Sequence, residues 1–177
     1  MRILNIDPSP EKIAQEVVLK DSAFLQYIIN DDNDLPYRNE IFTIERIRES
    51  DLTEANKLQC ANQNCYRVEM YNFGIDVSSR AIVDITAKKV ISVQHLRSFQ
   101  PNIPLRLKMI ALKIALESPE VKAELGYDPT EEDALMVDTK TSLNKSKCQR
   151  SKHLCVAPTF VKGDRALWCI VDLTDFK

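Results

Sequence analysis

Apolar positions along the first half of the chain change from helical spacing to the alternation of strands. Residues 9–28 are apolar at helical spacing and begin with Ser9, a good N-cap, and Pro10, which suits a first helical position. Asp21 is also a good cap, so the helix is expected to end or restart there. Strands are then predicted at residues 40–48, 66–73, 80–86 and 90–94. The polar residues 51–64 are expected to form a connection.

The second half repeats this order after two prolines at positions 101 and 104, which disfavour helix and central strand alike. An amphipathic helix is indicated by one apolar stripe: Leu105, Met109, Leu112 and Leu116. Ser118 followed by proline predicts a second helical piece, which ends at Gly126. A short strand is expected at residues 134–138, and a hairpin pairs 155–161 with 166–172.

One short sequence occurs twice. Residues 80–86 read RAIVDIT, and residues 165–174 read RALWCIVDLT. A pair of cysteines stands upstream of each copy, and the first cysteines of the two pairs are as far apart as Asp84 and Asp172. This agreement at two separate points indicates a tandem duplication.

The predicted fold class is α+β, with two tandem modules in each of which a helix packs on an antiparallel sheet. The prolines at the junction give a first module at residues 1–97 and a second at 98–177. The second module has no counterpart of the last strand of the first, so we expect an edge of its sheet to be open or covered by another chain segment. Trp168 lies in a strand that is apolar on both faces, and it is expected in the core, with an anchor of an interface as the alternative.

Composition narrows the classes of partner. The 177 residues are 44% hydrophobic, which suits a globular chain. The formal net charge is −2 and the pI is about 5.8, so the overall charge does not attract nucleic acid or an anionic membrane. No apolar run approaches the roughly 18 residues of a membrane helix. The first residues lack a signal-peptide core, which favours a cytoplasmic protein, or a secreted one if a signal peptide was removed.

Four of the five cysteines form the two pairs: Cys60 with Cys65, and Cys148 with Cys155. They are candidate local disulfides, which would require an oxidising compartment. Reduced structural thiols fit equally well. A zinc site built from these thiolates, with His153 as a substitute ligand, is disfavoured because the spacings lack the tight Cys-x2-Cys knuckle.

The sequence contains no clear set of catalytic residues. His153 is close enough in sequence to activate Cys148 or Cys155, but no oxyanion hole or orienting acid can be recognised. Asp84 and Asp172 precede turns, where carboxylates commonly accept hydrogen bonds from backbone amides. Cys169 is expected in the core, opposite Pro158 in the predicted hairpin.

A basic stretch covers residues 140–153, which contain no Asp or Glu. Its candidate binding residues are Lys145, Lys147, Arg150, Lys152 and His153. Such a stretch can bind phosphate groups or an acidic partner. The lack of stacking aromatics and the absence of a basic counterpart at 51–64 favour a solvated loop over nucleic-acid binding.

The order of motifs resembles the paired N-terminal domains of copper amine oxidases. The resemblance rests on residues 80–93, on Gln100-Pro101 with the helix that follows, and on the run ESPEVKAELG at 117–126. In that family, these domains are two small cystatin-like α+β modules that precede the catalytic domain. The resemblance therefore implies two tandem cystatin-like modules and an accessory role.

The resemblance does not bring an active site. The family makes its quinone from a Tyr in an Asn-Tyr-Asp or Asn-Tyr-Glu motif and holds copper with three histidines, whereas this chain has only His95 and His153. We therefore expect a non-catalytic accessory or binding protein without cofactor or metal. Its expected partner is a protein, with a homodimer as one option, and neither nucleic acid nor membrane is favoured. A protein-interaction or inhibitor module is the alternative, although the Gln-x-Val-x-Gly wedge of cystatin inhibitors is absent.

Overall fold

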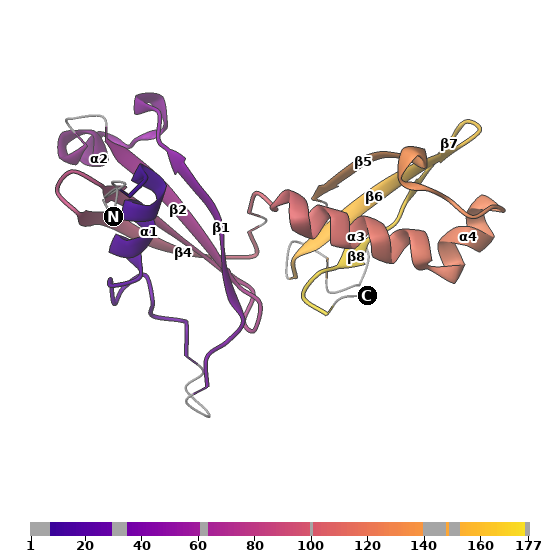
Figure 1. Ribbon diagram of the computed structural model, residues 1–177, viewed down its shortest axis with the longest axis horizontal. Helices are drawn as coiled ribbons and strands as arrows, with labels where there is room; N and C mark the ends of the chain where they lie inside the picture. Colours follow the sequence, from indigo (N-terminus) through magenta and orange to yellow (C-terminus); the bar gives the residue numbers. More distant parts are fainter. Residues whose placement is uncertain are drawn as a thin grey trace, which may run out of the picture. The chain divides into compact units, whose positions relative to one another are not determined.

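Figure 1 shows the computed structural model of the chain, which describes residues 8–29, 35–60, 64–99, 101–139, 148 and 153–175, with the backbone alone at 136–139. The chain forms two compact units. Unit 1 comprises Met1–Asn72 and Ser78–Leu96, and unit 2 comprises Phe73–Val77 and Arg97–Lys177. Each unit contains helices and an antiparallel sheet, so the predicted α+β class is confirmed.

Unit 1 is a helix on a four-stranded sheet. Helix α1 (Pro10–Val18) begins where predicted, because the Ser9 hydroxyl accepts a hydrogen bond from the amide of Lys12 at 3.3 Å. The sheet has the order β1-β2-β3-β4, and α1 contacts β1 and β2. Its strands are β1 (Asn39–Arg46), β2 (Cys65–Asn72), β3 (Val77–Asp84) and β4 (Lys89–Arg97).

The core of unit 1 lies between α1, the turns that follow it and one face of the sheet. Phe24 is fully buried in this core, and its amide donates to the Asp21 carboxylate at 2.8 Å, so the expected cap at Asp21 forms. The buried members of the core are Ala14, Val18, Phe24, Tyr66, Val68, Met70, Ala81 and Val83. Burial of these apolar groups is the main stabilising term of the unit.

The connection between β1 and β2 is more structured than the sequence suggested. It contains the 3-10 turn η1 (Glu49–Asp51) and helix α2 (Glu54–Gln59), within the segment predicted as a polar connection. The Thr53 hydroxyl accepts the amide of Asn56 at 3.3 Å and caps α2. The prediction failed because α2 has no buried residues, and so no apolar periodicity marks it.

Unit 2 is built around strand β6 (Cys155–Lys162), which is central in its sheet. Strand β5 (Ala134–Thr139) pairs with one side of β6, and β7 (Arg165–Trp168) and β8 (Val171–Asp172) pair with the other. Helix α3 (Leu105–Glu117) contacts β5, β6 and β8, and α4 (Pro119–Leu125) and the 3-10 turn η2 (Glu131–Asp133) complete the unit. Among the described residues, no helix is long and apolar enough to cross a bilayer.

The packing of α3 differs from the predicted stripe. Of the predicted stripe, Leu105 and Met109 are exposed and Leu112 is buried, and the helix also buries Leu107, Ala111 and Ala115, which lie outside the stripe. The helix is apolar on more than one side, so spacing alone did not identify the buried face. The two alanines lack bulk, which lets the backbone of the helix lie close to the sheet.

The structure also corrects the prediction for Trp168. It was expected in the core, but its side chain is 62% exposed. The predicted strand 166–172 is interrupted at Cys169 and Ile170, between β7 and β8. The register of the hairpin is nevertheless as predicted, because Lys162 pairs with Arg165 and the amide of Cys169 donates to the Pro158 carbonyl at 2.9 Å.

The repeated sequence forms the same contacts in both units. Asp84 Oδ1 accepts the amides of Thr86 at 2.8 Å and Ala87 at 3.0 Å. Asp172 Oδ1 accepts those of Thr174 at 2.9 Å and Asp175 at 3.2 Å. The predicted role of both aspartates in turns is therefore confirmed.

A backbone hydrogen bond also recurs beside each cysteine pair. The residue after the turn aspartate donates to the residue before the second cysteine: Ile85 to Asn64 at 3.2 Å, and Leu173 to Leu154 at 2.8 Å. The structure joins Cys60 to Cys65 and Cys148 to Cys155 by disulfides, with Cα–Cα distances of 5.9 and 5.8 Å. Each disulfide thus holds the start of β2 or β6.

Removing either disulfide should destabilise the protein. The bonded cysteines are 5 and 7 residues apart, and closing loops of this size in the unfolded chain is worth about 2 kcal/mol each. We expect Cys148→Ser/Cys155→Ser and Cys60→Ser/Cys65→Ser to lower the free energy of unfolding by about that amount in denaturant titrations. Cys169→Ser is the control, because that thiol is free. Unchanged stability of both double variants would contradict the pairing.

Candidate functional site

Two pockets meet in unit 2 between helix α4 and strand β7. The larger, about 420 Å³, is lined by residues of α4 and of the β6–β7 hairpin: Glu124, Leu125, Lys162, Asp164, Arg165, Ala166 and Leu167. The second, about 340 Å³, is lined by Glu120, Val121, Glu124, Leu167, Trp168 and Cys169. Because they share Glu124 and Leu167, we describe them together as the α4–β7 groove. Its volume is in the range of small-molecule sites.

The hairpin turn places its charged residues on this groove. Gly163 adopts a positive φ of 62°, which a residue without a side chain accommodates readily. Lys162 and Arg165 are directly opposite each other across the turn and so point to the same face of the sheet. Two positions further along, Leu167 pairs with the fully buried Phe160. That face is therefore the one turned toward the helices.

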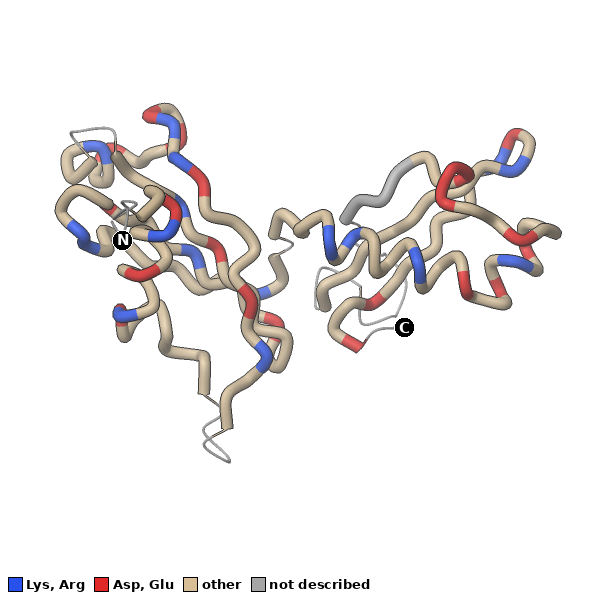
Figure 2. Tube along the Cα trace, in the orientation of Figure 1, with Lys and Arg blue, Asp and Glu red and all other residues tan. Residues whose placement is uncertain are grey.

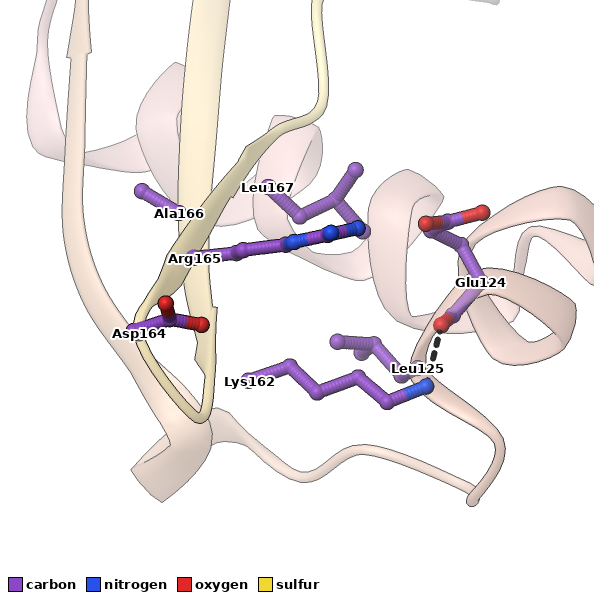
Figure 3. Close-up of a pocket in the computed structure, with 7 residues that line it drawn as sticks. All are labelled: Glu124, Leu125, Lys162, Asp164, Arg165, Ala166 and Leu167. Carbon is purple, nitrogen blue, oxygen red and sulfur yellow. Dashed lines mark hydrogen bonds between the residues drawn. The ribbon is translucent and has the colours of Figure 1, made fainter.

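Lys162 ties the hairpin to the end of α4. Its Nζ donates to the backbone carbonyl of Glu124 at 2.7 Å (Figure 3). The last carbonyls of a helix lack partners within the helix and carry partial negative charge, so a cation is favourable there. Gly126 ends α4 with a φ of 78°. This contact fixes the distance between the two walls of the groove.

Arg165 and Glu124 face each other across the groove. Figure 3 shows the guanidinium of Arg165 extended over Leu167 toward the side chain of Glu124. In the part of the chain that the structure describes, neither charged group forms an ion pair with the other or with a third side chain. Arg165 and Glu124 thus place a cation and an anion beside the apolar residues Leu125 and Leu167, and the other charged residues of the groove are Lys162, Asp164 and Glu120.

The arginines of unit 1 are in a different situation. Arg67 and Arg80 line a pocket of about 220 Å³ on the sheet. Arg67 forms an ion pair with Glu45, and Arg80 Nε donates to Glu69 Oε1 at 2.6 Å. The Glu69 side chain is largely buried, so losing Arg80 would leave a buried carboxylate without its charge partner. These arginines are therefore explained by the stability of the sheet.

Charges of both signs are interspersed over each unit. Figure 2 shows Lys and Arg beside Asp and Glu along the described elements, and both signs meet at the tip of the β6–β7 hairpin. This mixture agrees with the balanced composition. Four of the five predicted binding residues of the basic stretch, Lys145, Lys147, Arg150 and Lys152, lie outside the described residues.

The two histidines have specific neighbours. His153 Nδ1 lies 2.8 Å from Asp172 Oδ2. His95 Nδ1 lies 2.9 Å from the Ser79 hydroxyl, and Nε2 lies 3.0 Å from the carbonyl of Ala23. His95 therefore holds β3, β4 and the turn after α1 together. The cysteines near His153 are joined to each other, so a thiolate nucleophile is not present there in this state.

The groove was not predicted from the sequence. The turn residues around Gly163 predicted the hairpin, and the hairpin register placed Lys162 opposite Arg165. What the sequence does not give is the position of α4 relative to β7. Glu124 lies at the groove because α4 packs against the hairpin, and its backbone carbonyl accepts the hydrogen bond from Lys162. Every residue has a backbone carbonyl, so the amino-acid sequence cannot indicate this acceptor.

Cys169, on the wall of the groove, should react slowly. Burial raises the pKa of its thiol to about 11. Because the thiolate is the nucleophile, its reactive fraction at pH 8 is about one hundredth of that of an ordinary cysteine. Alkylation of the folded protein by iodoacetamide, followed by mass spectrometry, should be slow at pH 8 and accelerate up to about pH 11. Reaction at pH 8 as fast as in the denatured chain would show that this account of Cys169 is wrong.

Comparison with known proteins adds no relative to these observations. No protein-family model matches the chain, and a search of curated proteins found no match.

Proposed function

We propose that the protein is a non-catalytic binding module built from two tandem cystatin-like units, of the kind that precede the catalytic domain in copper amine oxidases. Each unit packs a helix on an antiparallel sheet, and both repeat the same aspartate turn and the same disulfide position. These shared contacts support a duplicated module. The two disulfides favour an oxidising compartment as its site of action.

The α4–β7 groove is the observation that carries the binding role. Its opposite charges, Arg165 and Glu124, are separated by an apolar floor and are not neutralised by each other. A ligand that brings a carboxylate to Arg165 and an ammonium to Glu124 satisfies both, with an apolar part over Leu125 and Leu167. The ligand class that fits is a small zwitterion with an apolar side chain, such as a free amino acid or a short peptide.

The lining of the larger pocket supports a role without catalysis. Its charged residues are Lys162, Arg165, Glu124 and Asp164, and its other residues are aliphatic. Lys162 is engaged with the end of α4, and no lining residue is a Ser, Thr, Cys or His that could act as an activated nucleophile. Arg165 is suited to hold a carboxylate, since a guanidinium offers paired donors but does not give up its proton.

Binding can be tested with phenylalanine and two analogues that each lack one charge, 3-phenylpropionate and phenethylamine. We expect phenylalanine to bind most tightly in calorimetry and to shift amide signals of α4 and β7 in NMR spectra. Arg165→Gln or Glu124→Gln should weaken binding roughly tenfold or more, since a hydrogen bond to a charged group is worth about 1.5–3 kcal/mol.

Lys113→Gln is the matched control. Lys113 is exposed on α3, pairs with Glu117 at 3.8 Å and is not part of the groove, yet its loss changes the net charge as Arg165→Gln does. Lack of phenylalanine binding, or equal binding by the Arg165, Glu124 and Lys113 variants, would refute the proposed ligand class.

Self-association is a second candidate function, favoured by exposed apolar side chains on β7 and on the neighbouring strand β6. Trp168 of β7 and Val161 of β6 are both exposed. Within the described residues β7 is a terminal strand of its sheet, and terminal strands are common sites of pairing with a strand of another chain. Two copies can add these edges to each other and cover the tryptophans.

A dimer formed in this way should dissociate when its apolar anchor is lost. Light scattering during size-exclusion chromatography should give a mass above the 20.3 kDa monomer at high concentration, and Trp168→Ala should return it to the monomer. Leu58→Ala, at an exposed leucine of α2 in unit 1, is the control. A monomeric wild-type protein at every concentration would exclude this assembly.

A further inference from the structure

The pocket beside Arg67 and Arg80 lies on the face of the unit 1 sheet that is turned away from the core. Val68 of β2 and Ala81 of β3 belong to the core, so their neighbours Arg67 and Arg80 point to the other face of the sheet. We call this pocket of about 220 Å³ the outer pocket of unit 1. Its residues from the three strands β2, β3 and β4 are Arg67, Arg80, Ile82, Ser92 and Gln94.

The connection between β1 and β2 forms the other wall of the outer pocket. It contributes Asp51 of η1, the cap residue Thr53 and Asn56 of α2. Core packing does not account for α2, because the helix has no buried residues. The Cys60–Cys65 disulfide joins the C-cap of α2 to the first residue of β2 and so holds this wall against the sheet. A wall that is fixed before binding lowers the conformational cost of binding a ligand.

The charges of the outer pocket favour a neutral ligand. Arg67 forms an ion pair with Glu45, and Arg80 forms one with Glu69. The third charged residue of the lining is Asp51, a carboxylate. An anionic ligand would lie beside this carboxylate, and a cationic ligand would lie beside the two guanidinium groups. Either sign of charge therefore meets repulsion that a neutral ligand avoids.

Three polar side chains of the outer pocket have hydrogen-bonding groups to offer a ligand. Within the described parts of the chain, the side chains of Asn56, Ser92 and Gln94 form no hydrogen bond with another protein group. Each amide supplies two N–H donors and one acceptor oxygen, and the hydroxyl of Ser92 both donates and accepts. A planar amide can thus bind two neighbouring hydroxyl groups of one ligand. Ile47 and Ile82 add a small apolar surface to these polar groups.

The size and lining of the outer pocket narrow the class of neutral ligand. Among the described residues that line it, none is aromatic, so a nucleobase would find no side chain on which to stack. Sites for drug-sized ligands usually measure about 300–1,000 Å³, so this smaller pocket suits a single ring. A monosaccharide is a neutral ring with several hydroxyl groups and with C–H groups on its faces. Its hydroxyls match the amides, and its C–H groups match the isoleucines.

We propose that the outer pocket of unit 1 binds a neutral monosaccharide. Asn56, Ser92 and Gln94 hydrogen-bond its hydroxyl groups, and Ile47 and Ile82 contact its C–H groups. The two arginines keep their role in the stability of the sheet and leave the site without a net positive charge. This site lies in unit 1 and shares no residue with the α4–β7 groove, so it does not depend on the zwitterion proposed there.

NMR titrations of the isotopically labelled full chain with D-glucose, D-galactose and D-mannose test this site. At least one hexose should shift amide signals of α2, β3 and β4 to saturation and leave those of α4 and β7 unchanged. The 6-phosphate and the 2-amino analogue of that hexose should bind at least about fivefold more weakly, because each brings a charge into the pocket.

Asn56→Leu and Gln94→Leu should each weaken binding of the hexose about fivefold, which is the usual net effect of one neutral hydrogen bond. Both variants should fold, since these side chains form no hydrogen bond within the described protein. Gln59→Leu is the matched control, because it also replaces an amide by leucine on an exposed position of α2 but does not line the pocket. The proposal would be overturned by three hexoses that all give no saturable shift, by charged analogues that bind as tightly as the hexose, or by equal losses in Gln59→Leu and Gln94→Leu.

Discussion

The fixed start of the central strand is the constraint on which both units depend. In unit 2 the Cys148–Cys155 disulfide and the hydrogen bond from Leu173 to Leu154 hold the first residue of β6. From there β6 runs without a break to the hairpin turn, so its start also sets where Lys162 meets α4. The groove and the contact of His153 with Asp172 thus lie at opposite ends of one anchored strand.

The two units share a helix packed on an antiparallel sheet and a disulfide at the start of the central strand, but their charged residues differ in their contacts. In unit 1, β4 completes the sheet, and the arginines on its surface are neutralised by Glu45 and Glu69. In unit 2, no strand of the described part pairs with the outer edge of β7, and Arg165 lines a groove. Stability accounts for Arg67 and Arg80 of the first unit, whereas Arg165 of the second forms no ion pair among the described residues and is the residue on which the proposed binding role rests.

Short-range signals in the sequence predicted many of the helix caps, turns and strand pairings. The caps at Ser9 and Asp21, the turn aspartates and the hairpin register depend on contacts within a few residues or on strand pairing across a tight turn. The failures have tertiary causes. Helix α2 buries nothing, and the exposure of Trp168 depends on what covers its strand. The groove and the approach of Asp76 to His153 join segments that are distant in sequence, which no local pattern encodes.

Peptide mapping of the unreduced protein tests the central claim most directly, because it reports which cysteines hold the start of each central strand. The account predicts that proteolysis releases one linkage between Cys60 and Cys65 and one between Cys148 and Cys155, with Cys169 as a free thiol. A linkage that joins a cysteine of one pair to a cysteine of the other, or five free thiols in protein kept under oxidising conditions, would contradict it.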